Sequence, residues 1–134
     1  MDPYATSHFS NDALRHDLKA RVANDCRSTA VLLSRIGEFD ERKLYLEDGY
    51  ASMHSYCVNE LHYCEGTASW RIYTARAARR FPLLFDAVAD GRLHLTAVVL
   101  LSKYLTSGNV EELVAAATHR SKAEIEHVIA ARFP

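Results

Sequence analysis

The sequence contains few residues that interrupt helices, since its 134 residues include only five glycines and three prolines. It also has no low-complexity tract and no internal repeat. Long segments with so few breakers favour helices over a set of short strands. No stretch approaches the roughly 20 consecutive apolar residues that a helix needs to cross a bilayer, so we expect no membrane-spanning segment.

An excess of charge of one sign is also missing. The 16 Lys and Arg residues are balanced by 17 Asp and Glu residues, which gives a formal net charge of −1. A strongly basic balance would by itself indicate nucleic-acid binding, so here any such function must rest on a local cluster of charge. The chain length and the 49% hydrophobic content are ordinary for one globular domain.

Cysteine is scarce, and its pattern does not indicate a disulfide framework. Cys26, Cys57 and Cys64 are odd in number and form no CxxC pair, which is typical of a reduced, intracellular protein. Residues 1–10 are polar and do not resemble a signal peptide. We therefore expect a soluble, cytoplasmic protein in which residues 1–10 are a flexible lead-in and residues 11–134 form a single domain.

Motifs for metal binding and for catalysis are weak. His54, Cys57, His62 and Cys64 lie within eleven residues, but they lack the full paired spacing of zinc sites, so a structural zinc ion is only a minor alternative. No Gly-rich elbow, phosphate loop or pair of carboxylates accompanies them. We predict no catalytic residue, no metal site and no cofactor, and we expect that this chain is not an enzyme.

The hydrophobic spacing predicts an all-α fold of about seven helices. A long first helix is expected from Asn11 or Asp12 to Ile36, with Gly37 as its end. A possible short helix is expected near residues 41–46, followed by helices over 53–61, 65–81, 82–90 and 95–105. Asn109 is expected to cap the next helix, and residues 121–124 form a capping box that opens the last one, completing a C-terminal helical pair.

An apolar seam runs along the predicted first helix, with spacings that alternate between three and four residues. Such a seam either forms a coiled-coil-like interface between two copies of the chain or packs on the other helices of the domain. The sequence leaves both interpretations open, with a slight preference for a homodimer. The residues predicted to form that interface are Leu14, Leu18, Val22, Leu33 and Ile36.

Residues 52–81 have the proportions of a helix-turn-helix, because two predicted helices are joined by a turn of about three residues. In the second helix Ala68, Ile72 and Ala75 form a small apolar face. Between Gly66 and Phe81 there are four arginines and no acidic residue. This pattern predicts a helix that packs through its small residues and presents positive charge to DNA.

The predicted contacts to double-stranded DNA fall into two groups. The residues expected to face bases or nearby phosphates are Thr67, Ser69, Trp70, Arg71, Tyr73 and Thr74. The residues expected to neutralise phosphates are Arg76, Arg79, Arg80 and Arg92. The alternative is that the arginines form an ordinary solvated face and that Trp70 and Tyr73 pack in the core, in which case the chain is a protein-interaction domain without DNA binding.

Several strings of residues resemble a bacterial family. They are LYLEDGY (44–50), Tyr56-Cys57, ARAARRFP (75–82), GRLHL (91–95) and Arg120-Ser121-Lys122. In the order and spacing of these strings, the chain resembles the N-terminal helical domain that precedes an HNH endonuclease domain. The resemblance covers about two thirds of the chain. Residues 90–93 also resemble the segment after the recognition helix of ParB-like partition proteins. The ParB-like resemblance implies DNA binding through the second helix of the pair.

The sequence also departs from that family. His62 and Cys64 occupy the turn in which the family has a small residue and a serine cap, and no His-Asn-His constellation is present in these 134 residues. We therefore predict a non-catalytic DNA-binding module. Its expected role is either the targeting domain of an HNH nuclease or a stand-alone regulator.

Overall fold

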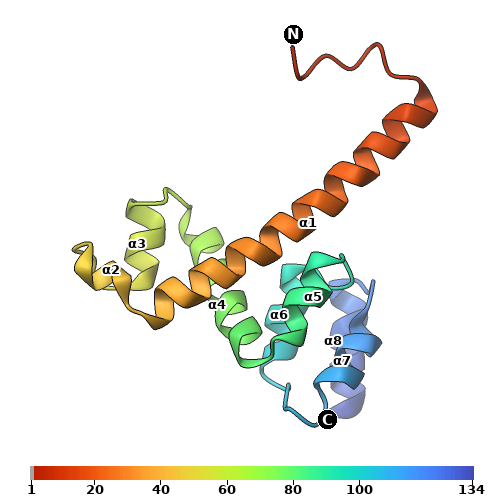
Figure 1. Ribbon diagram of the computed structural model, residues 1–134. Coiled ribbons are helices and arrows are strands. Elements are labelled where there is room, and N and C mark those ends of the chain that lie inside the picture. The colour runs from red at the N-terminus through yellow and green to blue at the C-terminus, as the bar shows by residue number, and fades with distance from the viewer. Residues whose placement is uncertain (1) are drawn as a thin grey trace.

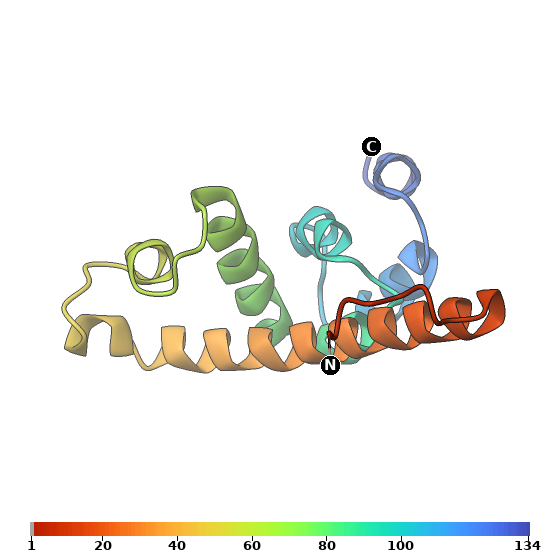
Figure 2. The same cartoon turned by 90° about the horizontal axis from the view of Figure 1, so that it is seen from above.

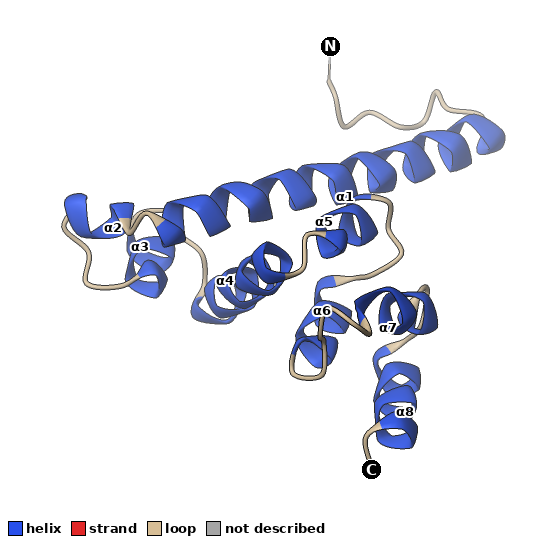
Figure 3. Cartoon of the chain, turned by 60° about the horizontal axis from the view of Figure 1, so that its bottom comes forward, coloured by secondary structure: helices blue, strands red, loops and turns tan. Residues whose placement is uncertain are grey.

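All regular structure in the described part of the chain, residues 2–134, is helical in the computed structural model (Figures 1 and 3). The all-α prediction is confirmed, with eight helices in that range. None of these helices is long and apolar enough to span a bilayer. The helices are α1 (Asn11–Glu41), α2 (Leu44–Glu47), α3 (Met53–Asn59), α4 (Glu65–Arg80), α5 (Leu83–Ala89), α6 (Leu95–Ser102), α7 (Val110–Ala117) and α8 (Lys122–Arg132).

The first helix starts as the sequence suggests but ends later. Its cap is Ser10, whose hydroxyl accepts a hydrogen bond from the Ala13 amide at 3.1 Å, rather than Asn11 or Asp12. The prediction that Gly37 ends the helix is wrong, because α1 continues to Glu41. Gly37 is buried inside the helix, and it marks the place where α1 crosses α4.

Helix α4 lies at the centre of the fold and contacts α1, α3, α5 and α6. Its small residues Ala68 and Ala75 have no exposed surface, and Ile72 is buried between them. A Cβ atom placed on Gly37 would lie 3.6 Å from the Ala75 carbonyl oxygen, which shows how closely the two helices approach. The predicted apolar face of this helix is therefore its packing face.

Among the C-terminal helices, α6 packs on α4, α7 packs on α5, and α8 packs on both α6 and α7 (Figure 2). The capping box at the start of α8 is confirmed by reciprocal hydrogen bonds between Ser121 and Glu124. Gly91 follows α5 with a φ of 80°, as expected of a residue that ends a helix. Asn109 does not cap α7 with its side chain, because that side chain accepts from the Thr106 amide and donates to the Tyr104 carbonyl.

The apolar seam of α1 has two halves with different surroundings. Leu33 and Ile36 are buried against the rest of the domain, with 1% and 4% of their surface exposed. Leu14, Leu18 and Val22 are exposed, and in Figure 1 this half of α1 extends away from the other helices. The prediction that Leu33 and Ile36 belong to a homodimer interface is therefore wrong, since their side chains pack inside one chain.

Candidate nucleic-acid interface

The predicted helix-turn-helix corresponds to α3 and α4. Ser52 caps α3 by accepting from the Ser55 amide at 3.0 Å, as the sequence predicts. In the turn, His62 adopts a left-handed conformation with φ 63°, and the Tyr63 amide donates to the Cys57 carbonyl at 3.0 Å. Cys64 then stands in extended conformation before the first turn of α4. The turn is thus tied back to α3, which fixes where α4 begins.

One side of α4 remains uncovered by the rest of the chain. Ser69, Trp70 and Tyr73 are exposed, and the two aromatic side chains keep 43% and 42% of their surface. They lie on the side of the helix away from Ala68, Ile72 and Ala75, with Tyr73 one turn after both Ser69 and Trp70. This outward-facing line, together with Thr67 at its start, is called the α4 stripe below.

The structure places Thr74 away from this stripe. Its side chain is fully buried, and its hydroxyl donates to the carbonyl of Trp70 or Arg71, at 2.8 and 3.1 Å. A serine or threonine hydroxyl inside a helix commonly bonds to the preceding turn in this way. The predicted DNA contact by Thr74 is therefore contradicted by its burial.

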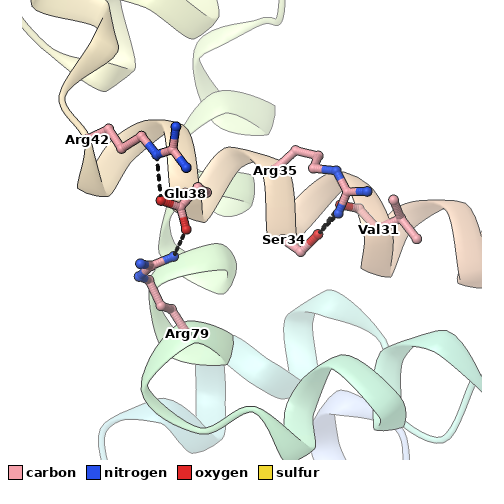
Figure 4. A network of polar contacts seen from close by, with 6 residues as sticks. All are labelled: Val31, Ser34, Arg35, Glu38, Arg42 and Arg79. Atoms are coloured by element: carbon pink, nitrogen blue, oxygen red, sulfur yellow. Dashed lines mark hydrogen bonds and ion pairs between the residues drawn. The ribbon is translucent and has the colours of Figure 1, made fainter.

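Two of the predicted phosphate-binding arginines form ion pairs with α1. Arg76 makes a bidentate pair with Asp40, with Nε–Oδ2 and Nη2–Oδ1 distances of 2.8 and 3.0 Å. Arg79 donates to Glu38 at 3.1 Å, and Glu38 also accepts from Arg42 at 2.8 Å (Figure 4). These pairs join α4 to α1, so the charges of Arg76 and Arg79 are already balanced within the chain.

These ion pairs shift the pKa of Glu38 down and the pKa of Arg76 up, which in both cases favours the charged form. Hydrogen bonds from Arg42 and then from Arg79 hold the pKa of Glu38 below its ordinary value. The hydrogen bonds to Asp40 raise the pKa of Arg76. Arg92 is likewise paired, to Asp90 of its own loop at 2.8 Å. The charged forms of Arg76 and Arg92 are therefore stabilised by carboxylates of this chain.

Arg71 and Arg80 have no carboxylate partner among residues 2–134, and both lie against aromatic rings. The Cζ atom of Arg71 is 5.4 Å from the centroid of the Tyr63 ring, and that of Arg80 is 5.1 Å from the centroid of Phe81. The Nε and Nη1 atoms of Arg71 are buried and find no hydrogen-bond acceptor in the described chain. Of the four arginines in α4, these two carry the charge that is not balanced internally.

The surface between α4 and α6 is hollowed on both sides of Trp70. On one side, a small apolar depression of about 180 Å³ is lined by Ser69, Trp70, Tyr73 and Val99. On the other side lies a groove of about 440 Å³, which is called the Arg71 groove below. The residues that line the Arg71 groove are Thr67, Trp70, Arg71, Leu95 and Thr96.

The position of Tyr73 is fixed by α6. Tyr73 Oη lies 3.0 Å from Ser102 Oγ, and that hydroxyl is also 2.8 Å from the Val99 carbonyl oxygen. Ser102 has only one proton to donate. When Ser102 donates to Val99, it accepts from Tyr73, so both contacts are satisfied in one chain of hydrogen bonds. The ring of Tyr73 is thereby held at the surface with one face exposed.

Two features of this region were not predicted from the sequence. Leu95 and Thr96 of α6 line the Arg71 groove, but they follow α4 by more than a dozen residues, and no local pattern links them to it. Cys64 Sγ lies 3.1 Å from Thr67 Oγ1, and the hydrogen bond with the Thr67 side chain lowers the pKa of the Cys64 thiol. The only sequence signal for the Cys64–Thr67 contact is a cysteine at the cap position of the predicted helix.

Comparisons with known proteins give no relative for this chain: no family model, no curated protein and no solved structure matches it. The resemblances to HNH-associated domains and to ParB-like helix-turn-helices therefore stay predictions. Within residues 2–134, no three His, Cys, Asp or Glu side chains come together in an arrangement able to hold a metal ion.

Proposed function

We propose that this chain is a double-stranded DNA-binding module that uses the α4 stripe as its contact surface. The observation that carries the proposal is the uncovered face of α4, which presents hydroxyl and aromatic side chains beside the exposed arginines near the end of the helix, while α1, α3, α5 and α6 contact its other side. Helix-turn-helix proteins bind DNA by placing the second helix of such a pair in the major groove.

In this proposal Thr67, Ser69, Trp70, Tyr73 and Arg80 keep the roles that the sequence predicts for them. Thr67 and Ser69 lie in the first two turns, where recognition helices make most of their base and phosphate contacts. Trp70 and Tyr73 supply apolar contact area with the sugars and bases. Arg80 supplies phosphate contact at the far end of the helix, where it carries unbalanced charge.

The paired arginines Arg76, Arg79 and Arg92 belong to the fold rather than to the proposed interface. Each already bonds to a carboxylate at 2.8–3.1 Å, and a phosphate would have to compete with that partner. The salt dependence of DNA binding should therefore be shallower than four free α4 arginines would produce. Two to four phosphate contacts predict an affinity loss of about 10- to 100-fold between 50 and 200 mM salt.

The test is fluorescence anisotropy of a labelled random-sequence duplex, titrated with the protein at about 50 and 200 mM salt. Binding at the lower salt concentration, weakened by the stated factor at the higher one, supports the proposal. The informative variants are Ser69→Glu and Tyr73→Glu, which place negative charge on the α4 stripe. The matched control is Ser107→Glu, which adds the same charge at an exposed position between α6 and α7. No binding by the wild-type protein at 50 mM salt would overturn the proposal.

A second candidate function, protein interaction through self-association, is favoured by a separate observation. Residues 11–25 of α1 are exposed apart from a half-buried Asp17, and Leu14, Leu18 and Val22 form an apolar line along them. A helical segment of this length is marginal in water without a packing partner. The segment has three acidic and three basic residues, so a second copy would meet no net repulsion.

The oligomeric state tests this candidate directly. We expect sedimentation velocity to show a dimer at tens of micromolar that Leu18→Glu converts to a monomer with an unchanged helical circular dichroism spectrum. A wild-type protein that stays monomeric at that concentration would remove the α1 interface from the account. It would leave the proposed DNA binding untouched. Whether it is a monomer or a dimer, a DNA-binding module would serve as the targeting part of a nuclease or as a stand-alone regulator.

A further inference from the structure

We propose that the Arg71 groove is a phosphate-binding subsite, in which the guanidinium of Arg71 and the hydroxyls of Thr67 and Thr96 hold a phosphate oxyanion. This inference rests on the proposed DNA binding for its ligand, a phosphodiester of the DNA backbone. The same chemistry would also accept a free phosphate group, and the experiment below separates the two sources.

The state of Arg71 is the main reason for this assignment. Two of its nitrogens are buried without an acceptor, and no hydrogen bond or ion pair within residues 2–134 involves the side chain. A guanidinium has five N–H donors, and donors left unsatisfied in a partly buried position are costly. Stacking on Tyr63 compensates only in part, since a cation–π contact supplies no hydrogen-bond acceptor.

The surroundings of Arg71 suit an anion. No acidic residue lines the groove, whose polar side chains besides Arg71 are the hydroxyls of Thr67 and Thr96. Thr67 Oγ1 accepts a hydrogen bond from the Cys64 thiol at 3.1 Å, so its own O–H remains free to donate to a phosphate. Arginine together with hydroxyl donors is the usual composition of a phosphate site. A phosphate in the groove would bond first to Nη2, the guanidinium nitrogen of Arg71 that is not buried, and only a movement of the side chain would give Nε and Nη1 an acceptor.

The position of the groove also decides between two roles for Arg71. Arg71 is half-buried between α4 and α6, whereas Ser69, Trp70 and Tyr73 stand on the exposed side of the helix. A base edge lies at the floor of the major groove and is reached by side chains that project from a helix. A recessed arginine instead meets the sugar-phosphate backbone at the rim. We therefore assign phosphate contact to Arg71, in place of the base contact that its position in the sequence suggests.

The experiment combines a DNA titration with a phosphate titration. Anisotropy of the labelled duplex is measured between 50 and 200 mM salt for the wild type, for Arg71→Gln and for Arg27→Gln. Arg27 is an exposed arginine of α1 that forms no ion pair within residues 2–134, so its variant removes the same charge from a different surface. The affinity loss between 50 and 200 mM salt should be about 3.5-fold smaller for Arg71→Gln than for the wild type, because one phosphate contact is lost. Arg27→Gln should lose affinity as the wild type does.

In parallel, inorganic phosphate is added to isotope-labelled protein while the Arg71 Nε–Hε signal and the Thr67 and Thr96 amide signals are followed by NMR. Saturable shifts of these signals at millimolar phosphate are expected. Thr96→Val should weaken them without altering the fold, which the rest of the spectrum reports. This variant keeps the test valid even if Arg71→Gln is destabilised.

The outcomes separate the two proposals. If DNA binds and Arg71→Gln has the same salt slope as wild type, the phosphate subsite is wrong while the DNA-binding proposal stands. If DNA does not bind but phosphate shifts the groove signals, the proposed function fails and the subsite holds a free phosphate group instead. If neither ligand has an effect at the groove, the subsite is rejected outright.

Discussion

Replacing Gly37 with alanine should stabilise the protein, although Gly37 is buried where two helices cross. Glycine inside a helix costs about 1 kcal/mol relative to alanine, because more backbone freedom is lost on folding. The usual objection is that a side chain would push the helices apart. Here the added Cβ would have its nearest neighbours at 3.6 Å, the Ala75 carbonyl oxygen, and at 3.9 Å, the Arg79 Cδ atom. Both distances are ordinary van der Waals contacts, so no backbone movement is required.

We therefore expect Gly37→Ala to raise the free energy of unfolding by about 0.5–1 kcal/mol and the melting temperature by a few degrees. The assay is urea denaturation followed by circular dichroism, with the slope of the transition checked for constancy. The matched control is Gly49→Ala. Gly49 has open space around its Cβ position but a φ of 89°, so alanine there should cost about 1 kcal/mol through backbone strain alone.

A loss of stability in Gly37→Ala would refute this reasoning. It would mean either that α1 ends near Gly37 in solution, as the isolated sequence suggests, or that α1 and α4 approach more closely than 3.6 Å at this point. A stabilisation in both glycine variants would also contradict the account, because Gly49 requires a positive φ.

Three further predictions follow from the same structure. Leu33→Ala should lower the free energy of unfolding by about 2–5 kcal/mol. Leu18→Ala should change it by less than about 0.5 kcal/mol in dilute monomeric protein. Equal losses of unfolding free energy in urea denaturation would contradict the division of the α1 seam into a buried and an exposed half. Alkylation of Cys64 should reach half its maximal rate at a lower pH than an ordinary thiol, because its pKa is lowered. Thr67→Val should move that profile to higher pH, and an unchanged profile would disprove the role of this hydroxyl. Arg76→Gln should reduce stability by about 1–3 kcal/mol, since Arg76 is exposed but its partner Asp40 keeps only 14% of its side-chain surface and would lose both hydrogen bonds. It should leave the salt slope of DNA binding unchanged, and a slope flatter by about one would instead place Arg76 on a phosphate.

The helical fold was predictable because its signals are local. Periodic apolar residues, the Ser52 cap and the Ser121–Glu124 capping box each act within one or two turns, and all of them are found in the structure. The end of α1 was not predictable in this way. A glycine after a helical pattern usually ends the helix, but at Gly37 the approach of α4 favours continuation, and that contact joins residues far apart in the sequence.

The candidate site was predictable only in its outline. The spacing of Ser69, Trp70 and Tyr73 places them on one face of a helix, and the structure leaves that face exposed. The state of the arginines depends on partners that local sequence does not reveal. Arg76 finds its carboxylate 36 residues away on α1, whereas Arg71 finds none. Charge counted along a helix therefore overestimates the charge available to a ligand.

The burial of Thr74 has a similar cause. A helix packed on one side would leave this position at the edge of its apolar face. Helix α4 is instead contacted by α1, α3, α5 and α6, so its buried arc is wider than the small residues Ala68 and Ala75 alone would indicate. The exposed arc that remains carries Ser69, Trp70 and Tyr73, with Arg76 and Arg80 toward the end of the helix.

The emission of Trp70 is the most direct measurement of the central claim, because Trp70 is the only tryptophan of the chain and lies in the middle of the α4 stripe with 43% of its surface exposed. Unlabelled duplex DNA is titrated into the protein at about 50 mM salt, and the salt concentration is then raised to about 200 mM. The account predicts a saturable change in Trp70 emission that largely reverses at the higher salt concentration. Emission that stays constant at DNA concentrations that saturate anisotropy would show that DNA binds elsewhere and would contradict the claim.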